Sequence, residues 1–455
     1  MALLSNAGTA APSKAPAKPQ PPAASTEAPP PAQSRCEGEG APNPQAARDA
    51  ELLETSSTDP RAQLQQLVQL SLERSRSIGA VKLLTMAAEA DYEEAKAQRM
   101  PTVSVGGTAG HVGGVLEGVT TARGLQARGA LNVTAPLYDS GRISKLTEWR
   151  RQLADAARFG QTGAEEQLAL QTVALALDRG RYQLQAQVYA QYTRKMACLV
   201  ESLEIITKAD RGRASELVQA LKTQQQADLS YAQTLSALRQ TEVRLKRFVG
   251  DPLPRAASMS AVLAQLPDLN EMQADVLLAA DVAQAAAQAK AQFSYAESVK
   301  AGQGPSVSLL VNGSTSTGQT RQSDWLGGVS VNIPIVTPGA DAAVTSALRR
   351  AQAANLQRDE AIEAKRYRVQ EMHEAASSAL DRARRVVDIL RNSERVRAST
   401  LQQWQQLGRR SLFDVMAAEG DYYSMRIAHV NALFDAEQVV AIIWSQGRGV
   451  MTPLR

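Results

Sequence analysis

The spacing of hydrophobic and polar positions changes at fixed places along the chain, and these changes predict where helices and strands alternate. Over about 59–99 the apolar residues recur at helical spacing, and Met100-Pro101 ends this helix because proline disfavours helix at the residue before it. Alternating polar and apolar residues then predict two-faced strands at about 101–112 and 125–136. The glycines between them predict a turn over 106–124 that joins the two strands. On the second strand one face carries only apolar and small residues: Leu125, Ala127, Gly129, Leu131, Val133 and Ala135.

A long helical hairpin follows these strands. The helical pattern continues for roughly 65 residues, or about 100 Å at 1.5 Å per residue, which far exceeds the usual globular helix. The chain reverses at a polar segment around Gly212 and returns in a second long helix, so the sequence predicts a hairpin over 141–250.

The second half of the chain repeats this order. A helix is predicted at about 268–300, and strands are predicted at about 305–316 and 325–335. A second hairpin at 341–447 reverses in the segment 408–411. Each first strand opens just after a proline, and each second strand ends in a proline followed by an aliphatic residue. The matching positions are Pro101 with Pro305, Pro136-Leu137 with Pro334-Ile335, and Gly141 with Gly339. We therefore expect two helix–strand–strand–helix repeats, 51–250 and 251–455, after an Ala/Pro-rich arm over 1–50 that we expect to be disordered.

Composition and charge support long helices packed through small side chains. Aromatic residues make up only 4% of the 455 residues, whereas compact cores depend on aromatic area. The 50 basic and 46 acidic residues give a net charge of +4 and are mixed along the same helices, which is typical of a solvated surface. We therefore expect no nucleic-acid partner.

The sequence offers no candidate catalytic centre. The histidines are His111, His373 and His429, and none of them has a second ligand at the spacing that metal sites use. Nucleophile elbows, phosphate loops and dinucleotide fingerprints are absent. We expect no catalytic residue, no cofactor and no bound metal, and hence a protein that is not an enzyme.

The predicted strands have the length and pattern of membrane strands. About ten residues cross a bilayer as a tilted strand, and one apolar and one polar face suit lipid outside and water inside. Trp325 and Tyr138 are candidate anchors at the membrane interface, although simple packing explains a lone ring equally well. Four strands cannot close a barrel, so strands in a membrane would require oligomerisation, and three copies would supply about twelve strands. No run of 18 apolar residues is present, so we expect no membrane-spanning helix.

The repeated Pro-opened strands, the strands that end in Pro136-Leu137 and Pro334-Ile335, and the two hairpin tips resemble the TolC-like outer membrane factor family. The resemblance covers roughly 60–450. It implies a mainly α chain with transmembrane β structure: a homotrimer with a 12-stranded β-barrel in the outer membrane, continued by a coiled-coil α-helical tunnel in the periplasm. It also implies outer membrane lipid, a periplasmic adaptor (membrane fusion) protein and an inner-membrane ABC transporter as partners.

The resemblance also assigns a candidate gate to the second hairpin tip. There the family uses an Arg to hold the entrance closed and an Asp to line the constriction, and these positions fall on Arg410 and Asp414. A second Asp that the family often has three residues further on is Ala417 in this chain, and a Tyr of the best-known member, five residues before the Arg, is Gln405. Glu216 on the first tip is a weaker candidate. The alternative is that Arg410 and Asp414, four residues apart, form an ordinary surface ion pair.

The resemblance leaves the exported substrate open. The drug-efflux branch often carries an acylated N-terminal Cys, and Cys36 follows Gln33-Ser34-Arg35 instead of small apolar residues. We therefore expect type I secretion of a protein such as a toxin, with small-molecule or drug efflux as the alternative. A soluble coiled-coil scaffold is the less favoured interpretation. It would suit the start at Met1, which offers only a fragment of a secretory signal; we expect the true start upstream.

Overall fold

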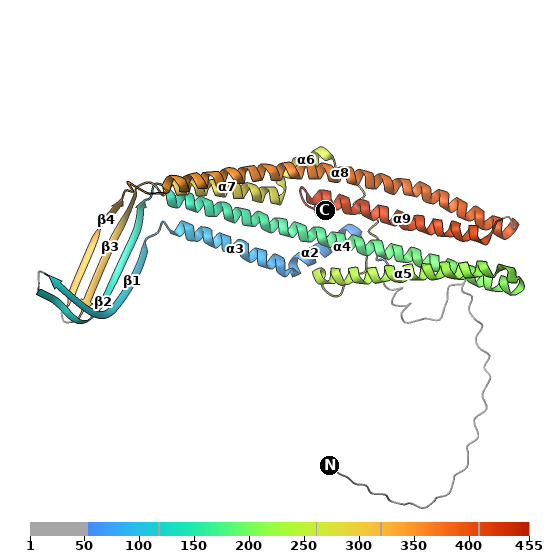
Figure 1. Ribbon diagram of the computed structural model, residues 1–455, viewed down its shortest axis with the longest axis horizontal. Coiled ribbons are helices and arrows are strands. Elements are labelled where there is room, and N and C mark those ends of the chain that lie inside the picture. Colours follow the sequence, from blue (N-terminus) through green and yellow to red (C-terminus); the bar gives the residue numbers. More distant parts are fainter. Residues whose placement is uncertain (1–52, 117–118, 261, 319–320, 408–409, 455) are drawn as a thin grey trace, which may run out of the picture.

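The molecule is a long body with a small sheet at one end and two helical hairpin tips at the other (Figure 1). The computed structural model describes residues 53–116, 119–260, 262–318, 321–407 and 410–454. The predicted arm over 1–50 lies outside these residues.

Helices make up most of the body. The α-helices are α2 (Pro60–Arg74), α3 (Arg76–Ala97), α4 (Arg142–Ala209), α5 (Ala214–Val249), α6 (Leu269–Asp275), α7 (Ala280–Ala301), α8 (Ala340–Leu407) and α9 (Leu412–Ser445). Short 3₁₀ turns are η1 (Arg211–Arg213), η2 (Val276–Leu278) and η3 (Thr452–Leu454). The helices α4 and α8 each have 68 residues, about 100 Å at 1.5 Å per residue, and run along most of the body (Figure 1).

The first helix of each repeat is divided, although the sequence pattern predicted continuous helices. Ser75 ends α2 and caps α3, because its hydroxyl accepts a hydrogen bond from the backbone N–H of Ile78. A serine that bonds nearby backbone competes with helix continuation. In the second repeat the extended backbone of Ala279 separates α7 from α6 and η2.

The sheet has four antiparallel strands in the order β1-β2-β3-β4: β1 (Thr102–Leu116), β2 (Val119–Tyr138), β3 (Ser306–Thr317) and β4 (Gln322–Asn332). The Gly-rich turn predicted to reach residue 124 is wrong. The glycines of β1 pair with β2, as Gly106 does with Ala130 and Gly107 with Gly129. The partner strand supplies the hydrogen bonds that outweigh the usual turn preference of glycine.

The strand register places most of the large apolar residues of both repeats on one face. Val105 lies opposite Leu131, which lies opposite Gly313, which lies opposite Trp325. A neighbouring row consists of Val103, Val133, Val311 and Gly327, and another contains Ala135, Leu309 and Val329. The opposite face carries mostly polar residues, among them Ser104, Thr108, Asn132, Thr134, Ser308, Asn312 and Ser330, with Val112, Leu310 and Leu326 as its large apolar residues. Since the side chains of a strand alternate between faces, the sheet has one apolar and one polar surface.

The helical body is held together by a central core and by a cluster near the tips. The central core joins residues of α2, α4, α5 and α9 with the segment between α5 and α7, and Leu177, Leu245 and Phe434 are fully buried in it. Among the described residues, α9 is long and apolar enough to meet the length and hydropathy of a membrane span, but 44% of its most apolar stretch is buried inside the bundle, so it is weak evidence for one.

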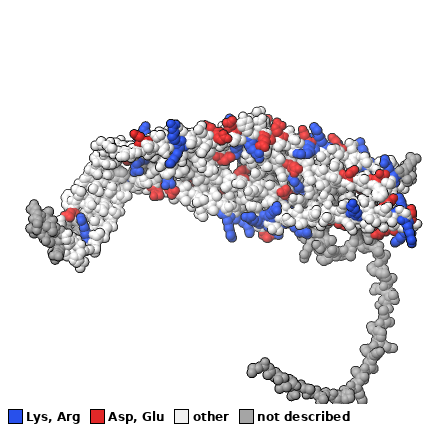
Figure 2. Space-filling model, viewed as in Figure 1, with Lys and Arg blue, Asp and Glu red and all other residues white. Residues whose placement is uncertain are grey.

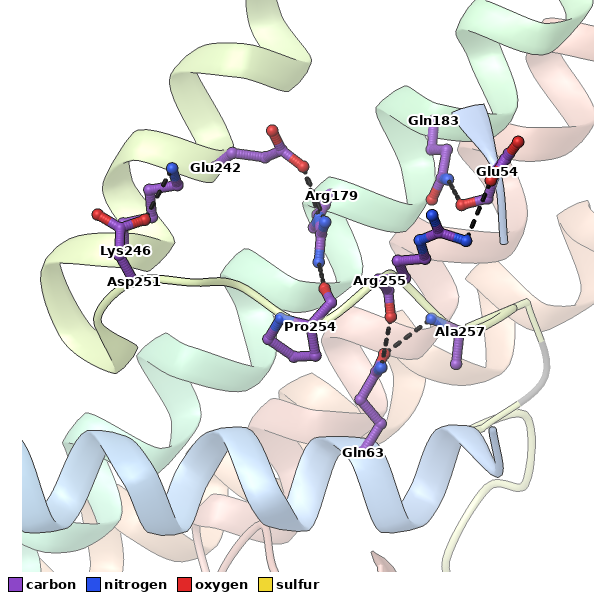
Figure 3. Close-up of polar contacts among 10 residues, drawn as sticks. All are labelled: Glu54, Gln63, Arg179, Gln183, Glu242, Lys246, Asp251, Pro254, Arg255 and Ala257. Carbon is purple, nitrogen blue, oxygen red and sulfur yellow. Dashed lines mark hydrogen bonds and ion pairs between the residues drawn. The ribbon is translucent and has the colours of Figure 1, made fainter. Parts of the chain in front are cut away.

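A polar junction fixes the linker between the two repeats (Figure 3). The buried Gln63 of α2 bonds this linker through both amide atoms: its Nε2 donates to the carbonyl of Arg255 at 2.6 Å, and its Oε1 accepts from the N–H of Ala257 at 2.8 Å. Arg179 of α4 donates to the carbonyl of Pro254 at 2.7 Å and pairs with Glu242 of α5. The junction thus ties both halves of the chain to the middle of the body.

Candidate functional site

The two hairpin tips lie together at the end of the body opposite the sheet (Figure 1). They pack through an apolar group that we call the tip cluster: Met196, Leu199, Val200 and Leu203 of α4, Ala220 of α5, and Leu412, Val415 and Met416 of α9. Trp404 of α8 packs against the same group. The tip cluster therefore positions the second tip, which carries the predicted gate residues, against the first.

Arg410 and Asp414 lie together at the second tip. The Nη1 of Arg410 is 4.0 Å from Oδ2 of Asp414, and both side chains are about half exposed, so the pair by itself contributes at most a few tenths of a kcal/mol. Arg410 also donates from Nε to Oε1 of Gln403 on α8, at 3.1 Å. Arg410 therefore connects both helices of the hairpin.

Asp414 has a second role that the sequence analysis missed. Its Oδ2 accepts a hydrogen bond from the backbone N–H of Ser411, and the Ser411 hydroxyl accepts one from the backbone N–H of Asp414. This reciprocal pair is a capping box at the start of α9. The signal was present in the sequence, because a Ser is followed three residues later by an acidic residue.

No described contact joins Glu216 to Arg410 or Asp414. Glu216 lies in the first turn of α5, largely buried, and pairs with Arg213 of its own tip at 3.3 Å between Oε2 and Nε. Among the described contacts, the two tips meet through apolar side chains.

A buried charged group lies next to the tip cluster, on the side away from the tip. The sequence analysis missed this group as well. Glu419 of α9 is 1% exposed, with Lys195 of α4 at 3.8 Å and Arg397 of α8 at 3.5 Å. Nearby, the ring centroids of Tyr192 and Tyr423 are 4.8 Å apart. Burial first, and the charge of Glu419 second, raise the pKa of both tyrosines above the ordinary value. Local sequence could not reveal this group because its members come from three helices.

The predicted interface residues lie on the apolar face of the sheet, toward opposite ends. Trp325 of β4 is 85% exposed and lies opposite Gly313, whereas Tyr138 lies at the helical end of β2, opposite Val307. Six residues separate these rows on β3, or about 20 Å along the strand. In Figure 2 the sheet is nearly free of charged side chains, whereas both signs are scattered over the helical body.

Within the described residues, no group of three or more His, Cys, Asp or Glu side chains could hold a metal ion. A cavity of about 690 Å³ lies between α4, α7, α8 and the segment after α9. Its charged groups already have partners in the chain, since Asp281 pairs with Lys365 and Glu166 accepts from the N–H of Val450. The cavity therefore offers no evident ligand site.

Solved structures with the same fold are outer membrane channels, whereas no family model and no curated protein sequence matches the chain. A crystal structure of CusC, described as forming a transmembrane channel, has 19% identity and a TM-score of 0.76, covering 84% of this chain and 92% of that one. The outer membrane protein VceC from Vibrio cholerae has 16% identity and a TM-score of 0.74, covering 85% and 97%. The open state of the MtrE outer membrane channel from Neisseria gonorrhoeae has 18% identity and a TM-score of 0.73, covering 86% and 90%.

These likenesses cover 84–86% of this chain and 90–97% of the solved chains. The predicted fold class, mainly α with a small β part and long coiled hairpins, is confirmed. The chain has the fold of the TolC-like outer membrane channels.

Proposed function

We propose that the protein is the outer membrane channel-tunnel of an export system that spans the bacterial envelope. Three copies would form a 12-stranded barrel in the outer membrane, continued by a helical tunnel in the periplasm. The observation that carries the proposal is the sheet. Its exposed apolar face lies opposite a polar face, and β1 and β4 form its two outer edges.

The edges argue for assembly into a closed barrel. Unpaired strand edges in lipid would cost several kcal/mol for each unsatisfied backbone group. Pairing β4 of one copy with β1 of the next removes every edge. Side chains such as Val105, 81% exposed, would then face lipid, with Trp325 and Tyr138 near the two membrane interfaces.

The long helices of three copies would pack side by side into the tunnel. Large apolar side chains remain exposed along the body, among them Leu229 and Val243 of α5 and Leu356 and Tyr367 of α8. Contacts between copies would bury them. Arg410 and Asp414 then hold the narrow entrance at the tips, where a periplasmic adaptor and an inner-membrane transporter would deliver the substrate.

The proposal is tested by fractionating cells and measuring the molecular mass of the extracted protein. We expect a detergent-extracted trimer in the outer membrane that forms conducting pores in a planar lipid bilayer. A monomer found only in the cytosol would overturn the proposal and favour the soluble scaffold.

Within this function we favour type I secretion of a protein, with an ABC transporter as the energy source. The support is the sequence before Cys36, where Gln33-Ser34-Arg35 stands in place of the small apolar residues of a lipid-attachment site. Efflux of small molecules is the second candidate. Deleting the gene separates them: loss of a secreted protein supports secretion, and increased drug susceptibility with normal secretion supports efflux.

A further inference from the structure

Glu419 is a buried carboxylate at the contact between the two hairpins. It is 1% exposed, and neither of its oxygens has a hydrogen-bond partner in the described part of the chain. A buried charge is costly unless it is paired, and here two cations from different helices offset the cost. Lys195 belongs to the first hairpin and Arg397 to the second. Glu419 thus connects α9 both to its own hairpin partner and to the neighbouring hairpin.

Directional contacts continue along α9 away from the tip. One turn beyond Glu419, the ring of Tyr423 packs on Tyr192, and a further turn on, Arg426 donates from Nη1 to Oε1 of Gln191 at 2.5 Å. We call this group the polar seam: Gln191, Tyr192 and Lys195 of α4, Arg397 of α8, and Glu419, Tyr423 and Arg426 of α9. It fixes the register of α9 against α4, because charge pairs and hydrogen bonds depend on the positions of both partners and tolerate little sliding.

The contacts on the other side of Glu419, toward the tip, differ in kind. There α9 meets α4 through the tip cluster, whose buried side chains are aliphatic or thioether. Hydrophobic contact is non-directional, and methionine adapts readily to new neighbours. The change from polar seam to tip cluster therefore divides α9 into a part fixed in register and a part that can shift.

We propose that Glu419 is a positioning residue for the gate: by holding α9 between Lys195 and Arg397, it sets the closed position of the tip that carries Arg410 and Asp414. This inference rests on the proposed channel function. During opening, the part of α9 between its start at the tip and Glu419 moves. The polar seam keeps the rest of α9 in register with α4.

The test compares single-channel conductance of purified trimers in a planar lipid bilayer. Glu419→Gln keeps the shape of the side chain but leaves both cations without their counter-charge. We expect the fraction of open channels to rise about tenfold or more. Losing one partner of a buried ion pair destabilises the closed state by more free energy than a tenfold shift between closed and open states requires. Lys195→Met should also raise the fraction of open channels. Lys195→Arg keeps the charge and should leave the channel closed, as in wild type.

Glu437→Gln is the matched control. Glu437 lies on the same helix and is also fully buried, but no cation pairs with it among the described residues. We expect this variant to keep the wild-type conductance. A folded Glu419→Gln trimer with wild-type gating would overturn the proposal, and so would an equal effect of Glu437→Gln, which would indicate general loosening. If Glu419→Gln does not fold, unchanged gating in Lys195→Met overturns it. Absence of any pore from the wild-type protein would instead overturn the channel function.

Discussion

At the scale of single residues, buried carboxylates stand out in a helical body whose other charges are mostly exposed. Glu437 of α9 is fully buried, and its oxygens have no hydrogen-bond partner within the described chain. Burial raises its pKa from 4.5 to about 8, although the nearby backbone of Val262 partly opposes the change. The group is therefore mainly neutral in the folded protein at pH 7.

This raised pKa predicts how stability depends on pH. In the unfolded chain Glu437 ionises near pH 4.5, so the folded state binds the extra proton between that pH and about 8. The stabilisation is present below pH 4.5 and is lost as the pH rises through 8. Wild type therefore loses stability as the pH rises, whereas Glu437→Gln does not titrate at this position. We expect the free energy of unfolding of Glu437→Gln, relative to that of wild type, to increase by about 2–4 kcal/mol between pH 5 and pH 9. Thermal unfolding of both proteins across this range measures the difference, and a difference independent of pH would contradict the assignment.

At the scale of the elements, the sheet predicts opposite outcomes for neighbouring residues. Leu131 lies on the apolar face of β2 and Asn132 on the polar face. We expect Leu131→Arg to lower the yield of folded trimer in the outer membrane, because Arg facing lipid costs about 2–4 kcal/mol near the bilayer centre. Asn132→Arg faces water and should assemble nearly normally. The amounts of heat-modifiable trimer in isolated membranes give the comparison, and equal loss in both variants would count against a lipid-facing surface.

The sequence predicted these elements well where periodicity and proline agree, and poorly where tertiary contacts decide. The starts of β1 and β3 follow Pro101 and Pro305, as predicted. The glycines of β1 suggested a turn, because local preference does not include pairing with a distant strand. The break at Ser75 left a weak signal, since one serine rarely interrupts an otherwise regular helical pattern. Partners such as Lys195 for Glu419 lie more than 200 residues away and have no local signal at all.

At the scale of the whole molecule, three copies would place three Asp414 side chains around one axis. In the proposed trimer, Arg410 would help to keep the entrance closed, in addition to its weak pair with Asp414 within one copy. We expect Arg410→Ala and Asp414→Ala each to raise the conductance of the closed channel several-fold. Each substitution removes a charge and contacts that would keep the entrance narrow. Conductance and ion selectivity in planar bilayers test this.

Asp414 needs a separate control because it also caps α9. Ser411→Ala removes the other half of the capping box and costs about 1 kcal/mol of helix stability while keeping the carboxylate. If Ser411→Ala alters conductance as much as Asp414→Ala, the effect comes from the helix end and the gate assignment fails.

The unequal length of the two strand hairpins has a consequence outside the cell. β2 pairs with β3 only from Ala127 onward, so its first eight residues, Val119–Gln126, are paired with β1 alone and extend about 27 Å past the end of the pairing with β3. The 11 and 12 residues of β4 and β3 already suffice to cross a bilayer. In the proposed orientation the first hairpin would therefore rise above the lipid, where antibodies or phages could reach it on living cells, and a peptide inserted there would be displayed to the medium.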